Sequence, residues 1–338
     1  MIRRSVAAGL LIPTMLFVPF GCGKSRDRSA KLPVKIVTSG QIYTGLPVVL
    51  AASLGFYDDE GLSVQIESIQ SNPKAVQALA SGSADVSTGG FGQVVSLASQ
   101  GRDVKSFTTL MRGSPQVFVI APGSSNKVRS IGDLRGTPVG VGGPGGPGHL
   151  MLNWLLTRNG LSPSDVTIVT IGTLATAVAA VEHDKVQSAV LNEAEYLMLR
   201  KRGIDPPILV DLRGRENMKR VYGIEDYPNV VLMATGSWLR DHAEAARRLA
   251  RAINKTVQWM HQQTPANVAK ALPARYRGDW DIDLAAISTV LPMYSTRGEM
   301  TAEGAEAVKR VVSASIDSVR FAKFDLRKAY TNEFLPTL

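Results

Sequence analysis

Glycine and small polar residues gather at four points where the sequence pattern passes from an apolar strand to a helix. The first turn of a helix leaves backbone N–H groups without partners, and the positive end of the helix dipole attracts polar or negative groups. Glycine lets a ligand approach that backbone closely. Because ligands of open α/β sheets bind where strands end, we expect these junctions to line one site. The four segments are Ser39–Gly45, Thr88–Gly90, Gly142–His149 and Leu191–Glu193.

Three charged or titratable side chains lie at or near these junctions. His149 ends the third segment and either donates a hydrogen bond to a ligand or caps a helix at the surface. Glu193 starts a predicted helix, where a carboxylate is already favourable as a cap. If Glu193 faces the site instead, it would bind a cationic or hydrogen-bond-donating part of the ligand. Arg112 precedes an apolar run and is the nearest counter-charge for an anion.

The third segment overlaps a glycine pattern that also occurs in dinucleotide-binding proteins. Residues Gly140–Gly145 fit G-x-G-x-x-G between a strand and a helix. That site needs an acid at the end of the next strand to bind the ribose, yet Asp165 precedes the strand 166–170. Pro144 and Pro147 also remove two N–H donors from the loop. We therefore expect no dinucleotide. A phosphate-binding loop is excluded because no Lys-Ser or Lys-Thr follows the glycines.

Catalytic and metal-binding groups are scarce. The sequence contains neither H-E-x-x-H nor G-x-S-x-G, and His183, His242 and His261 lie among charged residues. One cysteine excludes a disulfide framework and every Cys-rich metal site. The 38 Lys and Arg outnumber the 29 Asp and Glu but are dispersed, which argues against nucleic-acid binding. We expect no catalytic residue, no cofactor and no metal.

The chain begins with a pattern that directs proteins across a membrane. Two arginines precede an apolar run from Val6 to Gly21, which is too short to span a bilayer and is typical of a secretory signal. The single cysteine, Cys22, comes next, which resembles a bacterial lipobox, although Pro19 and Phe20 depart from its usual residues. The alternative is an ordinary signal followed by an incidental cysteine. The predicted segments are a signal peptide over 1–21 and a flexible tether over 22–33, with an acylated Cys22.

The body of the chain alternates strand and helix patterns in two copies. Residues Ala75–Val86 correspond to Ala177–Ser188, and Val34–Val37 corresponds to Pro138–Val141. This order predicts an α/β fold with two lobes, each a mainly parallel sheet flanked by helices. An apolar extended run leaves each copy, and two such strands crossing between the lobes would form a hinge. The expected boundaries are 34–117 with the C-terminal helices of 236–338 for the first lobe, 122–228 for the second, and 118–121 and 229–235 for the hinge strands.

Four segments of the sequence resemble sequences of one family of transport proteins. They are Ala51–Leu62, Leu79–Val86, Ile131–Val141 and Gly160–Val166. With the export signal and the paired lobes, these segments make the chain similar to ABC-transporter solute-binding proteins of the nitrate, sulfonate and taurine type. The resemblance implies the type II periplasmic-binding fold and capture of a ligand by lobe closure.

The resemblance also implies a ligand site and partners. We expect a monomer at the extracytoplasmic face that takes a small organic anion or zwitterion to a membrane permease and its ATPase. One alternative is an enzyme on the same fold, of the menaquinone-pathway dehydratase type; another is a ligand-sensing protein that feeds a membrane receptor. The expected ligand contacts are Gly40, Gln41, Tyr43 and Thr44 on the first loop, Thr88, Gly89 and Gly90 on the second, Arg112 before a hinge strand, Gly145, Gly146 and His149 on the third loop, and Asn192 with Glu193 on the fourth.

Overall fold

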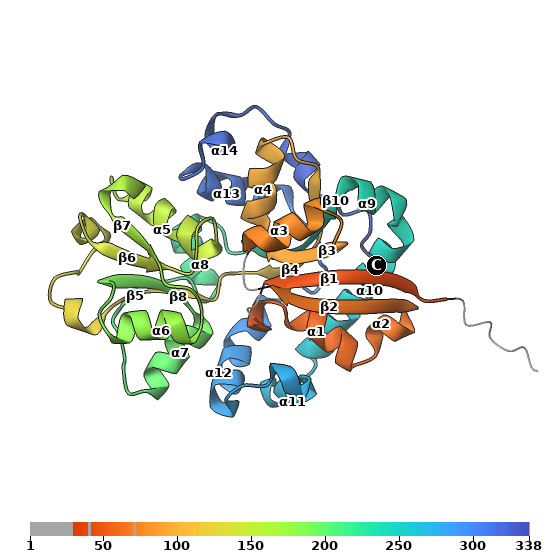
Figure 1. Ribbon diagram of the computed structural model, residues 1–338, viewed down its shortest axis with the longest axis horizontal. Helices are drawn as coiled ribbons and strands as arrows, with labels where there is room; N and C mark the ends of the chain where they lie inside the picture. Colours follow the sequence, from red (N-terminus) through yellow and green to blue (C-terminus); the bar gives the residue numbers. More distant parts are fainter. Residues whose placement is uncertain (1–29, 40–41, 70–71, 338) are drawn as a thin grey trace, which may run out of the picture. The chain divides into compact units, whose positions relative to one another are not determined.

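The computed structural model describes residues 30–39, 42–69 and 72–337. The predicted signal peptide and Cys22 lie outside the described residues, as does most of the predicted tether. Within the described ranges, ten strands form two five-stranded sheets, and helices cover them (Figure 1). The predicted α/β class with two sheets is therefore confirmed. We call each sheet with the helices packed on it a lobe.

The first sheet has the strand order β2-β1-β3-β10-β4. Strand β1 runs parallel to β2 and β3, whereas β10 runs antiparallel to β3 and β4. Val34 and Ile36 of β1 are buried in one core cluster and Val37 in another, because helices cover both faces of the strand. The strands are β1 Leu32–Ser39, β2 Leu62–Ile69, β3 Val86–Gly90, β4 Val104–Arg112 and β10 Pro228–Thr235. The tether prediction was thus wrong at its end, since residues 32 and 33 already pair with β2.

The second sheet repeats this arrangement with the order β7-β6-β8-β5-β9. Strand β6 runs parallel to β7 and β8, and β5 runs antiparallel to β8 and β9. Each position therefore has a counterpart in the first sheet, with β5 standing where β10 stands. The strands are β5 Gln116–Ile120, β6 Pro138–Val141, β7 Thr167–Thr170, β8 Ser188–Asn192 and β9 Ile208–Asp211.

Two segments of the chain connect the two sheets. One crossing is 113–115, between β4 and β5; the other is 212–227, which contains helix α8 (Arg215–Tyr222). The predicted hinge strands are instead ordinary sheet strands. Residues 118–120 pair within the second sheet and 229–235 lie in β10 of the first. The apolar runs identified these strands correctly, but burial within a sheet explains their apolarity better than a hinge does.

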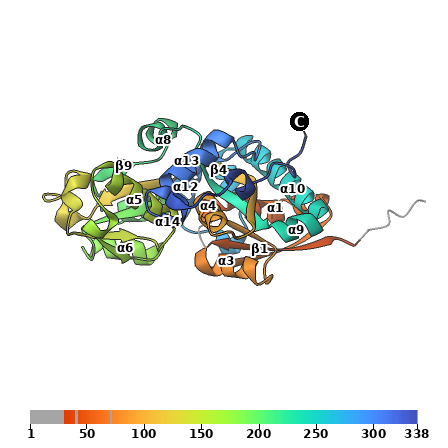
Figure 2. The ribbon, with the colours of Figure 1, turned by 90° about the horizontal axis from the view of Figure 1, so that it is seen from above.

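The helices of the C-terminal region contact both lobes. As expected, α10 packs on α1 and α2 of the first lobe, but α12 contacts α7 of the second lobe. Helix α13 contacts α5, also of the second lobe (Figure 2). At the second contact, Leu150 of α5 and Val312 of α13 both lie against Gly92 of α4, where a side chain would collide with them. The helices are α1 Leu46–Ser53, α2 Phe56–Asp59, α3 Asn72–Ala80, α4 Phe91–Ser99, α5 Pro147–Arg158, α6 Ala175–Glu182, α7 Glu193–Lys201, α9 Gly236–Asp241, α10 Ala243–His261, α11 Pro265–Ala271, α12 Trp280–Val290, α13 Ala302–Ser313 and α14 Asp317–Phe321.

Candidate functional site

Two pockets lie where the strand-to-helix junctions of both sheets meet the crossing segments. The first, which we call the polar pocket, is lined by glycine backbone, by neutral amide and hydroxyl side chains, and also by one leucine, two prolines and two tyrosines. Its lining residues are Gly90, Gly92, Gln93, Ser114, Gln116, Gly145, Pro147, Leu150, Tyr222, Tyr227, Pro228 and Asn229. Ser114 donates to Gln116 Oε1 at 2.9 Å, and Asn229 Nδ2 donates to the carbonyl of Gly113 at 3.0 Å. The crossing segment 113–115 and the ends of β5 and β10 beside it thus present hydrogen-bonding groups between the lobes.

The second pocket, which we call the apolar pocket, includes Pro115 of the crossing segment 113–115 in its lining. It is lined by Ile42, Tyr43, Thr44, Pro115, Leu174, Asn192, Glu193, Ala194 and Val290. The Tyr43 hydroxyl donates to Asp283 at 2.5 Å, and burial together with this carboxylate raises the pKa of Tyr43. Because the Tyr43 hydroxyl already donates its hydrogen bond to Asp283, Tyr43 contributes mainly its ring to the pocket.

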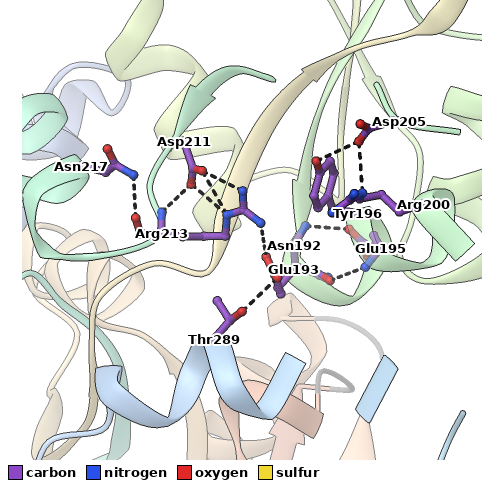
Figure 3. A network of polar contacts seen from close by, with 10 residues as sticks. All are labelled: Asn192, Glu193, Glu195, Tyr196, Arg200, Asp205, Asp211, Arg213, Asn217 and Thr289. Carbon is purple, nitrogen blue, oxygen red and sulfur yellow. Dashed lines mark hydrogen bonds and ion pairs between the residues drawn. The ribbon is translucent and has the colours of Figure 1, made fainter. Parts of the chain in front are cut away.

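Glu193 links the two lobes (Figure 3). Its side chain is only 6% exposed, and its Oε2 accepts from Arg213 at 2.9 Å. Its Oε1 accepts from the hydroxyl of Thr289 in α12 at 3.0 Å. Arg213 is held in turn by Asp211, with bonds of 2.9 Å from Nε and 2.7 Å from a terminal nitrogen. Both carboxylate oxygens of Glu193 are therefore engaged by the protein, although the residue lines the apolar pocket.

Asn192 and Glu195 cap the start of α7. Asn192 Oδ1 accepts from the Glu195 N–H at 3.1 Å, and Glu195 Oε2 accepts from the Asn192 N–H at 2.9 Å. The other oxygen of Glu195 accepts from the N–H of Leu174 at 2.9 Å. Burial raises the pKa of Glu195 to about 7, and the hydrogen bonds that its carboxylate accepts from the N–H groups of Asn192 and Leu174 oppose the rise. Glu195 was not among the predicted site residues, although the spacing Asn192-x-x-Glu195 is that of a capping box.

His149 supports the glycine-rich loop rather than lining either pocket. Its Nδ1 accepts from the backbone N–H of Gly145 at 2.9 Å. The ring proton of the neutral imidazole is then on Nε2, which faces the amide of Asn153 at 3.1 Å. Burial lowers the pKa of His149, so the neutral ring is favoured. Gly146 forms the N-cap of α5 beside this loop.

Arg112 is turned to a different part of the protein. Its side chain is 12% exposed and lies 3.9 Å from the Asp226 carboxylate. Its Nε donates to Ser295 at 3.1 Å, and a terminal nitrogen donates to the carbonyl of Glu299. It lines a separate cavity of about 460 Å³ and neither of the two pockets. The proposed counter-charge for an anion is therefore occupied by structural contacts.

The remaining predicted contacts are divided among several places. Gly90 and Gly145 line the polar pocket, and Tyr43, Thr44, Asn192 and Glu193 line the apolar one. Thr88 is buried in β3, and a side chain at Gly89 would lie 2.5 Å from Met233 Cε. Gly40 and Gln41 lie outside the described residues.

Comparison with known proteins identifies a family and a similar solved structure. The profile of a family described as "NMT1/THI5 like" matches residues 44–266. The chain belongs to this family. It is also 30% identical to a protein of solved structure from Bordetella bronchiseptica RB50, with a TM-score of 0.81 over 91% of this chain and 96% of that one.

Two proteins that match most of the length of this NMT1/THI5-like protein are named as binding proteins. The riboflavin-binding protein RibY of Chloroflexus aurantiacus is 27% identical over 308 residues, 86% of this chain and 82% of RibY. The alkanesulfonate-binding protein SsuA of Xanthomonas axonopodis pv. citri, solved with MOPS, has a TM-score of 0.68 at 16% identity, over 90% of this chain and 98% of SsuA. The predicted family resemblance and the predicted periplasmic-binding fold are thus confirmed.

One relative of this family member is an enzyme. The 4-amino-5-hydroxymethyl-2-methylpyrimidine phosphate synthase of Schizosaccharomyces pombe is 31% identical over 128 residues, which is 38% of this chain and 36% of the synthase.

Within the described residues, no group of three or more His, Cys, Asp or Glu could hold a metal ion. None of the helices in residues 30–39, 42–69 and 72–337 combines the length and the apolarity needed to cross a bilayer.

Proposed function

We propose that this protein is the solute-binding component of an ABC importer. It captures a small solute between its lobes outside the cytoplasm and delivers it to a membrane permease driven by an ATPase. The observation that carries the proposal is that both pockets are lined from both lobes. In the polar pocket, Gly90 belongs to the first lobe and Gly145 to the second. In the apolar pocket, Tyr43 belongs to the first lobe and Leu174 to the second.

Pocket size supports capture by lobe movement. The polar and apolar pockets have volumes of about 20 and 40 Å³, room for only a few water molecules. A small organic molecule therefore needs the lobes to separate before it enters. A solute that then bridges both lobes stabilises the closed arrangement and shifts the population toward it.

The lining suggests the chemistry of the solute. Among the described lining residues of both pockets there is no lysine or arginine, and the one acid, Glu193, is paired with Arg213. Amides, hydroxyls and backbone N–H groups suit an uncharged hydrogen-bonding part, and the apolar pocket suits a ring or hydrocarbon part. Riboflavin, the ligand in the name of the relative RibY, has both. A small anion or zwitterion, held by helix N-termini alone, is the second candidate.

The test is a thermal-shift panel with riboflavin, thiamine and cytosine beside taurine and nitrate. A binding compound should raise Tm and reduce the radius of gyration in small-angle scattering. Gln93→Ala, in the polar pocket, should weaken the shift, whereas Gln100→Ala, exposed at the end of the same helix, should not. Native mass spectrometry of the purified protein would identify a co-purified solute. Chemical turnover of a bound compound would contradict the proposal and favour an enzyme.

A further inference from the structure

Leu174 has a backbone conformation that side chains rarely adopt. Its φ is 54° and its ψ is −124°, a region that only glycine occupies readily. The residue immediately precedes α6, and its side chain is 42% exposed, so burial does not compensate for the strained backbone. Strained residues of this kind persist where the surrounding structure over-determines them, and they cluster at ligand-binding positions.

The side chain that fixes this conformation is Glu195. One carboxylate oxygen accepts from the N–H of Leu174 and the other from the N–H of Asn192, both at 2.9 Å. Glu195 is 4% exposed, so these bonds form away from water. They join the turn before α6 to the start of α7. Glutamine could not replace this group fully, because only one of its two terminal atoms accepts a hydrogen bond.

The result of this arrangement is that Leu174 lines the apolar pocket from the second lobe. Tyr43 and Ile42 line it from the first lobe, and Val290 from α12. A solute that enters this pocket must contact an exposed leucine side chain whose position is fixed by a buried carboxylate.

We propose that Leu174 is a ligand contact that selects solutes with an apolar or aromatic part, and that Glu195 is the positioning residue that holds it there. This inference rests on the proposed solute-binding function. Leu174 would contact the ring of a bound solute on one side while Tyr43 contacts it on the other. Glu195 itself would not touch the solute.

The test compares Leu174→Gly with Ile208→Ala, a control at another exposed apolar residue of the same lobe. The probes are riboflavin, thiamine and cytosine as ring compounds and taurine as a ring-free zwitterion, with affinity measured by titration calorimetry. Glycine adopts the conformation of Leu174 without strain, so Leu174→Gly should fold as well as the natural protein. We expect Leu174→Gly to lose at least tenfold in affinity for the ring compound that binds, and Ile208→Ala to leave it unchanged.

Glu195→Gln separates a positioning role from a structural one. It should weaken binding of the ring compound in the natural background but have no further effect in the Leu174→Gly background, because glycine needs no support. Equal losses in both backgrounds would overturn the positioning role. Unchanged affinity in Leu174→Gly, or binding of taurine but of no ring compound, would overturn the role of Leu174 and leave solute capture intact. Binding of none of the four probes would also count against it.

Discussion

The carboxylate of Glu193 and the hydroxyl of Thr289 form a 3.0 Å hydrogen bond between the start of α7 and α12. These residues are 96 positions apart in the sequence and belong to different lobes. The bond ends on a buried charge that Arg213 neutralises, so removing the hydroxyl leaves that charge with one donor fewer. Hydrogen bonds to charged groups contribute more to stability than neutral ones.

Thr289→Val should therefore destabilise the closed arrangement by about 1.5–3 kcal/mol. The measurement is the free energy of unfolding in urea, together with the radius of gyration without ligand, which should increase. Ser288→Ala is the control, since that hydroxyl bonds only to the carbonyl of Leu284 in its own helix at 2.7 Å. An unchanged radius of gyration would show that this bond does not hold the lobes together.

Glu195 should make stability depend on pH. Its pKa is raised from 4.5 to about 7 in the folded protein, so the folded state holds the proton more tightly than the unfolded state. Stability from this group is full below the ordinary pKa, decreases as pH rises toward about 7, and is constant above it. Relative to Glu195→Gln, the natural protein should lose up to about 3 kcal/mol between pH 4.5 and pH 8. The exposed Glu216→Gln is the control, and a Glu195→Gln variant with the natural pH dependence would contradict this prediction.

Gly92 should tolerate no branched side chain. A Cβ at this position would lie 2.9 Å from Leu150 Cδ1 and 3.0 Å from Val312 Cγ2. Gly92→Val should lower the free energy of unfolding by about 1–3 kcal/mol, the usual cost of overpacking. Gly143→Ala is the matched control, because no heavy atom lies within 4 Å of its added Cβ. Equal stability of the two variants would mean that α5 and α13 can move away from α4 at little cost.

Arg112 should matter for folding and not for ligand affinity. Its guanidinium donates to Ser295 and to the carbonyl of Glu299. Arg112→Met removes both donors, although Ser295 Oγ still accepts from the N–H of Gly298. We expect a loss of about 1–3 kcal/mol in unfolding free energy and no change in dissociation constant for any solute that binds. Arg215→Met, 68% exposed at the same cavity, should change neither quantity. A large loss of affinity for an anion in Arg112→Met would restore this residue to the binding site.

Cys22 offers a test of the proposed location. If the cysteine is acylated after cleavage of the signal, the mature protein should fractionate with membranes and carry the mass of the lipid. Cys22→Ala should release it into the soluble fraction with its fold unchanged. Continued membrane association of this variant would argue against the lipid anchor.

Much of the fold was readable from local patterns. The alternating strand and helix patterns of the two copies predicted two similar sheets. Periodicity carries this information because it depends on neighbouring residues only. The contacts of α12 and α13 with the second lobe were not predictable, since pattern shows which face of a helix is apolar but not which element covers it.

The candidate site was less predictable, because partners distant in sequence decide the role of each side chain. The pattern identified Glu193 as either a cap or a ligand contact, and Thr289 and Arg213 engage both of its oxygens. Arg112 was expected near an anion but is bonded to Ser295, 183 residues away. The strained backbone of Leu174 has no sequence signal, since leucine is not a residue that favours positive φ.

The placement of β5 and β10 has a consequence for how such proteins diversify. All five strands of the second sheet come from one uninterrupted stretch, 116–211, whereas the first sheet is assembled from pieces on both sides of it. One continuous stretch of DNA therefore encodes the whole second sheet, so a single exchange with two joints would replace that sheet. Such an exchange would change the lining that the second lobe gives to both pockets. The first sheet, encoded by the flanking DNA, would stay unaltered.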